Sequence, residues 1–119
     1  MPFKTILTNL VQIIPGSRGA ILADWEGESV EQFSLDDPFD LKVTAAHAGI
    51  ILSHCKELLA RFPAGSIQET VLTTAKQYIL IGAIGPDYAM VMTLDRNAAL
   101  GLALHRFRVC VQLLQREIY

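Results

Sequence analysis

The sequence predicts an α/β fold of the α+β type, in which a single five-stranded antiparallel sheet carries two helices on one face and one helix on the other. Three stretches place apolar residues at the helical spacings of three and four. Five shorter stretches alternate or run apolar between turn residues, as strands do. Their order is helix, two strands, helix, three strands, helix. At 119 residues the chain has the length of one domain, residues 1–119.

The first three elements are a helix followed by two strands. Apolar residues recur every three or four positions over residues 3–14, and Pro15-Gly16 ends this amphipathic helix. Pro2 suits its first turn. Residues 19–23 and 28–34 are the predicted strands, so the N-terminal part of the chain is expected to be a helix packed beside a hairpin.

The middle of the chain holds the second helix and a three-stranded meander. Asp37 is a good N-cap with Pro38 at the first helical position, and the helix is expected to run to about Arg61. Short turns join the three strands that follow, which makes them antiparallel neighbours. The predicted strands are residues 66–75, 77–84 and 88–94. The last two are nearly continuous apolar runs and should be central, whereas 66–75 has more polar residues and should be an edge strand.

The last helix runs to the C-terminus, and Asn97 is its expected cap. Its apolar residues recur at spacings of four and three, which predicts a core-facing stripe beside the first helix. Those residues are Leu100, Leu104, Phe107, Val111, Leu114 and Ile118. Gly101, near its start, would allow close backbone approach.

Composition excludes several classes of protein. Ten basic and twelve acidic residues give a net charge of -2, which provides no electrostatic footprint for nucleic acid. No apolar run approaches the ~20 residues of a membrane span. Cys55 and Cys110 lie inside apolar helical patterns and are expected to be buried free thiols, as in a reducing compartment. We therefore expect a cytoplasmic protein.

An acidic cluster around the first hairpin turn has two interpretations. Asp24, Glu26 and Glu28 alternate around Gly27, so they lie on one side of a hairpin tip. Three carboxylates can bind a divalent cation, but no second group of ligands accompanies them. The favoured interpretation is a tight turn in which Gly27 supplies a positive φ.

Other chemical motifs are weak. The sequence contains no P-loop and no nucleophile motif. "PGSRGA" follows a helix rather than a strand and is a poor dinucleotide signal. His47 and His54 lie on one side of the second helix, but two turns separate them by about 10.5 Å, too far for one metal ion. The expectation is a protein without catalytic residues, metal or cofactor.

Two segments resemble the Roadblock (dynein light chain) family. "GAILADWEGESV" is similar to that family's strand–turn–strand segment, and "DRNAALGLALHRFRV" is similar to its last helix. The order of elements also matches over essentially the whole chain. The chain is most similar to stand-alone MglB-type regulators, which engage a small Ras-like GTPase and promote its hydrolysis.

The resemblance implies a dimeric, non-enzymatic regulator that binds a small Ras-like GTPase and modulates its nucleotide hydrolysis. The alternative is a structural subunit of a motor or scaffold complex with no effect on hydrolysis. A third hypothesis, from the residues alone, is a small-molecule sensing domain, for which only Tyr78 and Tyr88 offer polar groups in the strand interiors. Arg18, Arg61 and Arg96 sit near element ends and are candidates for donated arginine fingers, but we expect none of them to act so.

The dimer is expected to form through the edge strand 66–75, since no proline blunts it. The residues assigned to this edge are Ile67, Glu69, Val71 and Leu72. The opposing interpretation is an edge guarded by Gln68, Glu69 and Lys76.

The second helix carries two apolar stripes, and the second of them is where we expect function. One stripe should lie on the sheet: Leu41, Ala45, Ala48, Leu52, Cys55 and Leu59, broadened by Ile51, Leu58 and Phe62. The other lies roughly opposite: Phe39, Val43, Ala46 and Ile50. Val43, Ala46 and Ile50 are assigned to the partner helix or the GTPase, and Phe39, His47 and His54 to the GTPase. Alternatively, the first helix or a loop covers this stripe within one chain.

Overall fold

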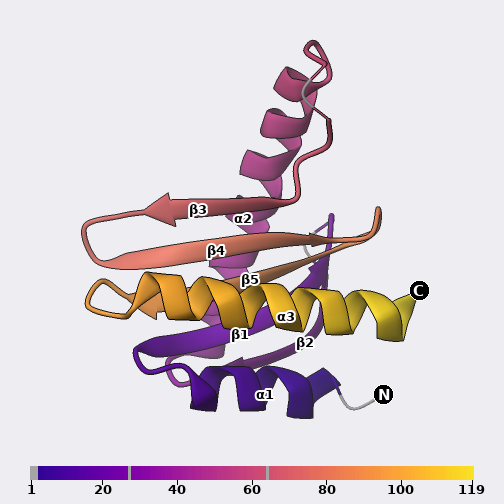
Figure 1. Cartoon of the computed structure of the whole chain (residues 1–119). Helices are drawn as coiled ribbons and strands as arrows, with labels where there is room; N and C mark the ends of the chain where they lie inside the picture. Colours follow the sequence, from indigo (N-terminus) through magenta and orange to yellow (C-terminus); the bar gives the residue numbers. More distant parts are fainter. Residues whose placement is uncertain (1–2, 27, 64) are drawn as a thin grey trace.

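A computed structural model describes residues 3–26, 28–63 and 65–119, and it has the predicted order of elements (Figure 1). Pro2 and Gly27, for which the sequence predicted a helix start and a turn, lie outside the described residues. The elements are α1 (Phe3–Ile13), β1 (Ser17–Asp24), β2 (Ser29–Ser34), α2 (Pro38–Leu59), β3 (Glu69–Thr73), β4 (Gln77–Ile84), β5 (Tyr88–Asp95) and α3 (Leu100–Ile118).

All five strands form one antiparallel sheet in the order β2-β1-β5-β4-β3. The apolar runs of β4 and β5 lie inside the sheet, as predicted, because strands covered on both faces need apolar residues throughout. β3 is an edge strand, which was also predicted, although it is shorter than the expected 66–75. β2 forms the other edge.

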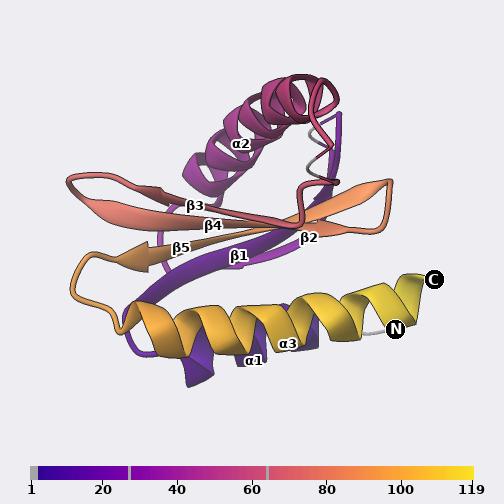
Figure 2. The ribbon, with the colours of Figure 1, turned by 45° about the horizontal axis from the view of Figure 1, so that its top comes forward.

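The sheet separates two helical layers (Figure 2). α1 and α3 pack side by side on one face, and α2 alone covers the other face. The alternation of each strand divides the core accordingly. Leu80 of β4 points into the cluster under α1 and α3, whereas its neighbour Ile81 points into the smaller cluster under α2.

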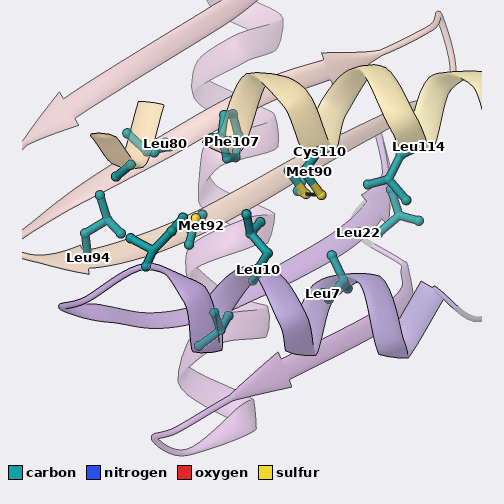
Figure 3. Packing of buried hydrophobic residues seen from close by; sticks show 14 of the residues in the cluster. Leu7, Leu10, Leu22, Leu80, Met90, Met92, Leu94, Phe107, Cys110 and Leu114 are labelled. Atoms are coloured by element: carbon teal, nitrogen blue, oxygen red, sulfur yellow. Dashed lines mark hydrogen bonds between the residues drawn. The ribbon is translucent and has the colours of Figure 1, made fainter. Parts of the chain in front are cut away.

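The larger cluster is built on α3, whose apolar stripe faces the sheet as predicted (Figure 3). Phe107 and Leu114 are fully buried, and the thiol of Cys110 lies 3.9 Å from the sulfur of Met90. The close approach occurs at Gly82 of β4, where an added Cβ would lie 2.9 Å from side-chain atoms of Phe107 and of Val111. Gly82 therefore lets the helix settle onto the strand.

Two predictions about the start of α3 were wrong. Gly101 is exposed and has no neighbour within 4 Å of an added Cβ, so it makes no close approach. Asn97 does not cap the helix, because the cap is Ala99, which makes no side-chain hydrogen bond. The Ala98 N–H donates to the Asp95 carbonyl at 3.1 Å, so the chain first makes a turn and enters the helix two residues later than expected.

α2 begins as predicted. Asp37 accepts a hydrogen bond from the Phe39 N–H at 3.0 Å, and Pro38 lies in the first turn. The helix ends at Leu59 rather than Arg61, and the next residues continue as turns. Among the described residues, no helix is both long and apolar enough to span a membrane.

Candidate functional site

The acidic hairpin tip is organised as a turn. One carboxylate oxygen of Asp24 accepts hydrogen bonds from the Glu26 N–H at 2.9 Å and the Glu28 N–H at 3.0 Å. The Asp24 N–H donates to the Glu28 carbonyl at 3.0 Å. This carboxylate therefore satisfies backbone donors that the turn would otherwise leave unpaired, the role typical of Asp in a turn. The described residues contain no group of three or more His, Cys, Asp or Glu that could hold a metal ion.

The histidines and cysteines are dispersed. His47 and His54 are both exposed on α2. Cys110 is a buried free thiol whose pKa is raised to about 11 by burial, as expected for a structural cysteine. Cys55 is also a free thiol, but it is only half-buried, contrary to the expectation that it lies against the sheet.

The three candidate arginine fingers differ in the contacts that their side chains make. Arg18 pairs with Asp36, with Nε 3.1 Å from a carboxylate oxygen. Arg96 lies 5.0 Å from the Tyr78 ring centroid and donates to the Thr74 carbonyl. Arg61 is exposed in the turns after α2. Two of the three side chains therefore already have partners within the chain.

β3 offers an open row of backbone groups. The Ala83 N–H donates to the Gln68 carbonyl, and the Thr74 N–H donates to the Gln77 carbonyl, so even-numbered positions of this segment bond to β4. In an antiparallel ladder the alternate residues direct their N–H and C=O groups away from that neighbour. The backbone groups of Glu69, Val71 and Thr73 therefore point outward from the sheet.

The side chains predicted for this edge divide between the two faces. Val71 packs against the cluster under α1 and α3, whereas Leu72 packs against the cluster under α2. Ile67 also packs under α2, although it precedes the strand. Glu69 accepts two hydrogen bonds from Arg108 of α3, each 2.8 Å. These bonds hold the pKa of the Glu69 carboxyl below its usual range.

The outer stripe of α2, formed by Phe39, Val43, Ala46 and Ile50, is uncovered in the single chain. All four residues are exposed, with Phe39 at 67% and Ile50 at 58%. α1 cannot cover them because it lies on the opposite face of the sheet (Figure 2). The hypothesis that α1 buries this stripe within one chain is therefore wrong.

A second exposed apolar stripe lies on the flank of α2, and the sequence did not predict it. Ile51, Cys55 and Leu58 follow one another at spacings of four and three; we call them the lateral stripe. They were expected to pack on the sheet, but Ile51 is 40% and Leu58 is 57% exposed. Phe62, assigned to the same face, is also exposed.

Two features explain this exposure: Ile51 and Leu58 lie about 90–110° around the helix from the buried residues, and the sheet ends beneath the C-terminal part of the helix. Leu41, Ala45, Ala48 and Leu52 are buried, but no residue of α2 beyond Leu52 is. Figure 1 shows α2 crossing the strands steeply and continuing past β3. Hydrophobic spacing indicates which side of a helix is apolar, but not where the surface beneath it ends.

The tyrosines considered for a ligand pocket have a structural position. Tyr78 and Tyr88 both pack against the cluster under α1 and α3. The described surface has several shallow hollows, including one of about 350 Å³ beside α3 lined in part by Gln68, Gly82 and Gln115. The candidate site is therefore built from the edge of β3 and the two stripes of α2.

Comparison with known proteins identifies relatives of this arrangement. A family model described as the Roadblock/LC7 domain matches residues 4–94. Among curated proteins, none matches the sequence significantly.

Solved structures share the whole fold. A Roadblock/LC7 domain from Streptomyces avermitilis has a TM-score of 0.87 at 19% identity and covers 97% of this chain and 96% of its own. MglB from Myxococcus xanthus has a TM-score of 0.87 at 15% identity, with 97% and 86% covered. A structure of MglB with a tetrameric arrangement has a TM-score of 0.84 at 19% identity, with 94% and 84% covered. At these identities the likeness shows the fold.

Proposed function

The chain belongs to the Roadblock/LC7 family, and on that premise we propose that it is a cytoplasmic, single-domain, dimeric regulator that binds a small Ras-like GTPase and modulates its nucleotide hydrolysis. The observation that carries the proposal is the uncovered apolar surface of α2, which extends beyond the sheet of its own chain. Exposed apolar area of this kind is typical of interaction sites. The resemblance to MglB-type regulators supplies the partner class, and the MglB of tetrameric arrangement supplies a self-associating structural neighbour.

The dimer forms by antiparallel pairing of two β3 strands. Because Glu69, Val71 and Thr73 direct their backbone groups outward, a twofold axis at Val71 pairs each Val71 with its own copy. It also pairs Glu69 of one copy with Thr73 of the other. Each such pair exchanges two hydrogen bonds, about six in all. This register uses the full length of β3, and the two sheets then become one.

Residues 53–59 of α2, which follow the last buried residue and which we call the overhanging end, reach this axis on the face of the sheet opposite α1 and α3. Strands lie ~4.8 Å apart and a helix rises ~1.5 Å per residue, so a steeply crossing helix passes one strand about every three residues. Leu52 lies in one cluster with Ile81 of β4. Because Leu52 is the last buried residue of α2, we place the passage over β3 near Cys55 and the axis between Cys55 and Leu58. Two antiparallel α2 helices meet there through their lateral stripes.

The outer stripe then becomes the platform for the GTPase. Phe39, Val43, Ala46 and Ile50 point away from the sheet, with His47 and His54 at the margin, and twofold symmetry doubles this surface. Val43, Ala46 and Ile50 were assigned to the dimer or the GTPase; the geometry favours the GTPase, because the lateral stripe faces the second copy.

Regulation in this proposal comes from contact rather than from a donated catalytic group. Arg18 and Arg96 are held by their own chain. The platform acts by holding the GTPase in one conformation, which requires that it bind the two nucleotide states with different affinity. The alternative, a scaffold or dynein-type subunit, binds its partner without regard to nucleotide.

A pulldown with a co-encoded small GTPase, loaded with GDP or a GTP analogue, tests the proposal. We expect nucleotide-dependent binding that is lost in the double variant Val43→Glu, Ile50→Glu. The matched control is Leu102→Glu with Val109→Glu, which places the same two charges, also seven residues apart, on exposed apolar residues of α3 on the other face. Equal binding of both nucleotide states would favour the scaffold, and retention by the Val43→Glu, Ile50→Glu variant would exclude the outer stripe.

A further inference from the structure

The overhanging end of α2, residues 53–59, has little support from its own sheet. Beyond Leu52 none of its residues is buried. The end of a helix frays where tertiary contacts are few, because packing supplies most of the stability of helices in proteins. If two copies of this segment are to meet in one geometry, something within each chain must hold it in place.

Trp25 supplies such a contact from the turn between β1 and β2. Its ring lies beneath Lys56 of α2, with the ammonium nitrogen 3.6 Å from the ring centroid. This is the geometry of a cation–π interaction. Its indole N–H donates to the carbonyl of Pro86, in the turn between β4 and β5, at 2.7 Å. One indole therefore connects two hairpin turns and offers its face to the helix.

The β4–β5 turn is itself held by a residue that follows α3. Tyr119, after α3, donates its hydroxyl to the Asp87 carboxylate at 2.9 Å, and its ring covers Gly85 so closely that an added Cβ would clash. The turn that accepts the indole hydrogen bond is thus fixed by α3, and Trp25 transmits that fixed position to α2.

We propose that Trp25 and Lys56 are positioning residues that hold the overhanging end of α2, residues 53–59. In doing so they set the geometry in which two copies present their platform. This inference rests on the proposed function for its consequence. The contacts of Lys56 with Trp25 and of Trp25 with Pro86, which we call the brace, lie within one chain. Neither residue need touch the second copy or the GTPase. Trp25 and Lys56 act on the interface indirectly, by keeping residues 53–59 in a fixed position.

The brace is tested in the monomeric Thr73→Pro background, where loss of the second copy cannot itself speed exchange, and Trp25 is the chain's single tryptophan. We expect Lys56→Ala to shift the tryptophan emission and to speed amide hydrogen exchange in residues 53–59, with residues 41–52 unchanged. Lys56→Arg keeps a cation over the ring and should preserve both readouts. The control is Lys42→Ala, which removes an exposed lysine from the part of the same helix that lies on the sheet.

The consequence for assembly is measured separately. Trp25→Ala and Lys56→Ala should each weaken self-association roughly two- to fivefold, the range that corresponds to an exposed cation–π contact. Trp25→Phe keeps the ring but loses the bond to Pro86, and should lie between. Unchanged exchange of residues 53–59 in both alanine variants would overturn the brace. Faster exchange in a chain that never dimerises would retain the brace and reject the proposed function.

Discussion

The guanidinium of Arg108 on α3 donates two hydrogen bonds of 2.8 Å to the carboxylate of Glu69, the first residue of the edge strand β3. The two residues are 39 positions apart in the sequence. The pair ties the start of the open edge to the helix that covers the larger core. An edge strand held at this end is fixed in register before any second copy arrives.

This pair makes the stability of the edge depend on pH. Because the folded-state pKa of Glu69 is lowered, its contribution is complete above the unfolded value of about 4.3 and is lost as pH falls through the folded value. A double-mutant cycle with Glu69→Gln and Arg108→Ala should give a favourable coupling in urea unfolding at neutral pH, kept small because solvent screens the exposed guanidinium, and this coupling should disappear in acid. Coupling that survives at the acid limit of folding would contradict an ionic pair.

The two glycines Gly82 and Gly49 should respond to alanine in opposite ways. Gly82→Ala places a Cβ 2.9 Å from the buried Phe107 ring and should destabilise the fold by about 1–3 kcal/mol. Gly49→Ala, inside α2, meets only the Trp25 carbonyl oxygen at 3.8 Å and should stabilise by about 0.5–1 kcal/mol. Denaturant midpoints of the two variants measure both effects. Equal effects of one sign would refute the packing of α3 on β4.

The core role of α3 predicts a large loss at Phe107. The ring is fully buried, so Phe107→Ala should cost about 3–5 kcal/mol. Leu102→Ala, on the exposed side of the same helix, should change stability by less than about 0.5 kcal/mol. A loss below about 1 kcal/mol at Phe107 would contradict its burial.

The two cysteines should differ in reactivity in the native protein. Burial shields the Cys110 thiol and raises its pKa to about 11, so little of it is thiolate at neutral pH. In the free monomer a thiol reagent should modify Cys55 alone until the protein is unfolded. In the dimer a short bismaleimide should link two copies through Cys55, because the lateral stripes meet near this residue. Native modification of Cys110 would show that α3 opens.

Much of the fold follows from local pattern. The period of apolar residues distinguished the three helices from the strands, and the apolar character of β4 and β5 identified them as central. Asp37 with Pro38 marked the start of α2 correctly, because a cap is a local interaction within a few residues. Asn97 misled for the related reason that Asn suits turns as well as caps.

The candidate site depended on features that spacing cannot reveal. Ile51 and Leu58 border the buried stripe at about 90–110° around the helix, and spacing alone does not tell whether the sheet is wide enough to cover them. The partnership of Lys56 with Trp25 joins residues on different elements. Gly82, not Gly101, proved to be the point of close approach, because it lies where α3 crosses β4.

Sedimentation equilibrium on a matched pair of Thr73 variants tests the central claim, β3 pairing, most directly. Thr73→Pro removes an outward N–H that the ladder to β4 does not use, whereas Thr73→Val keeps it. We predict that the native chain and Thr73→Val are dimers at micromolar concentration and that Thr73→Pro is a monomer with an unchanged circular dichroism spectrum. A monomeric native chain, or a Thr73→Pro variant as dimeric as Thr73→Val, would contradict the account.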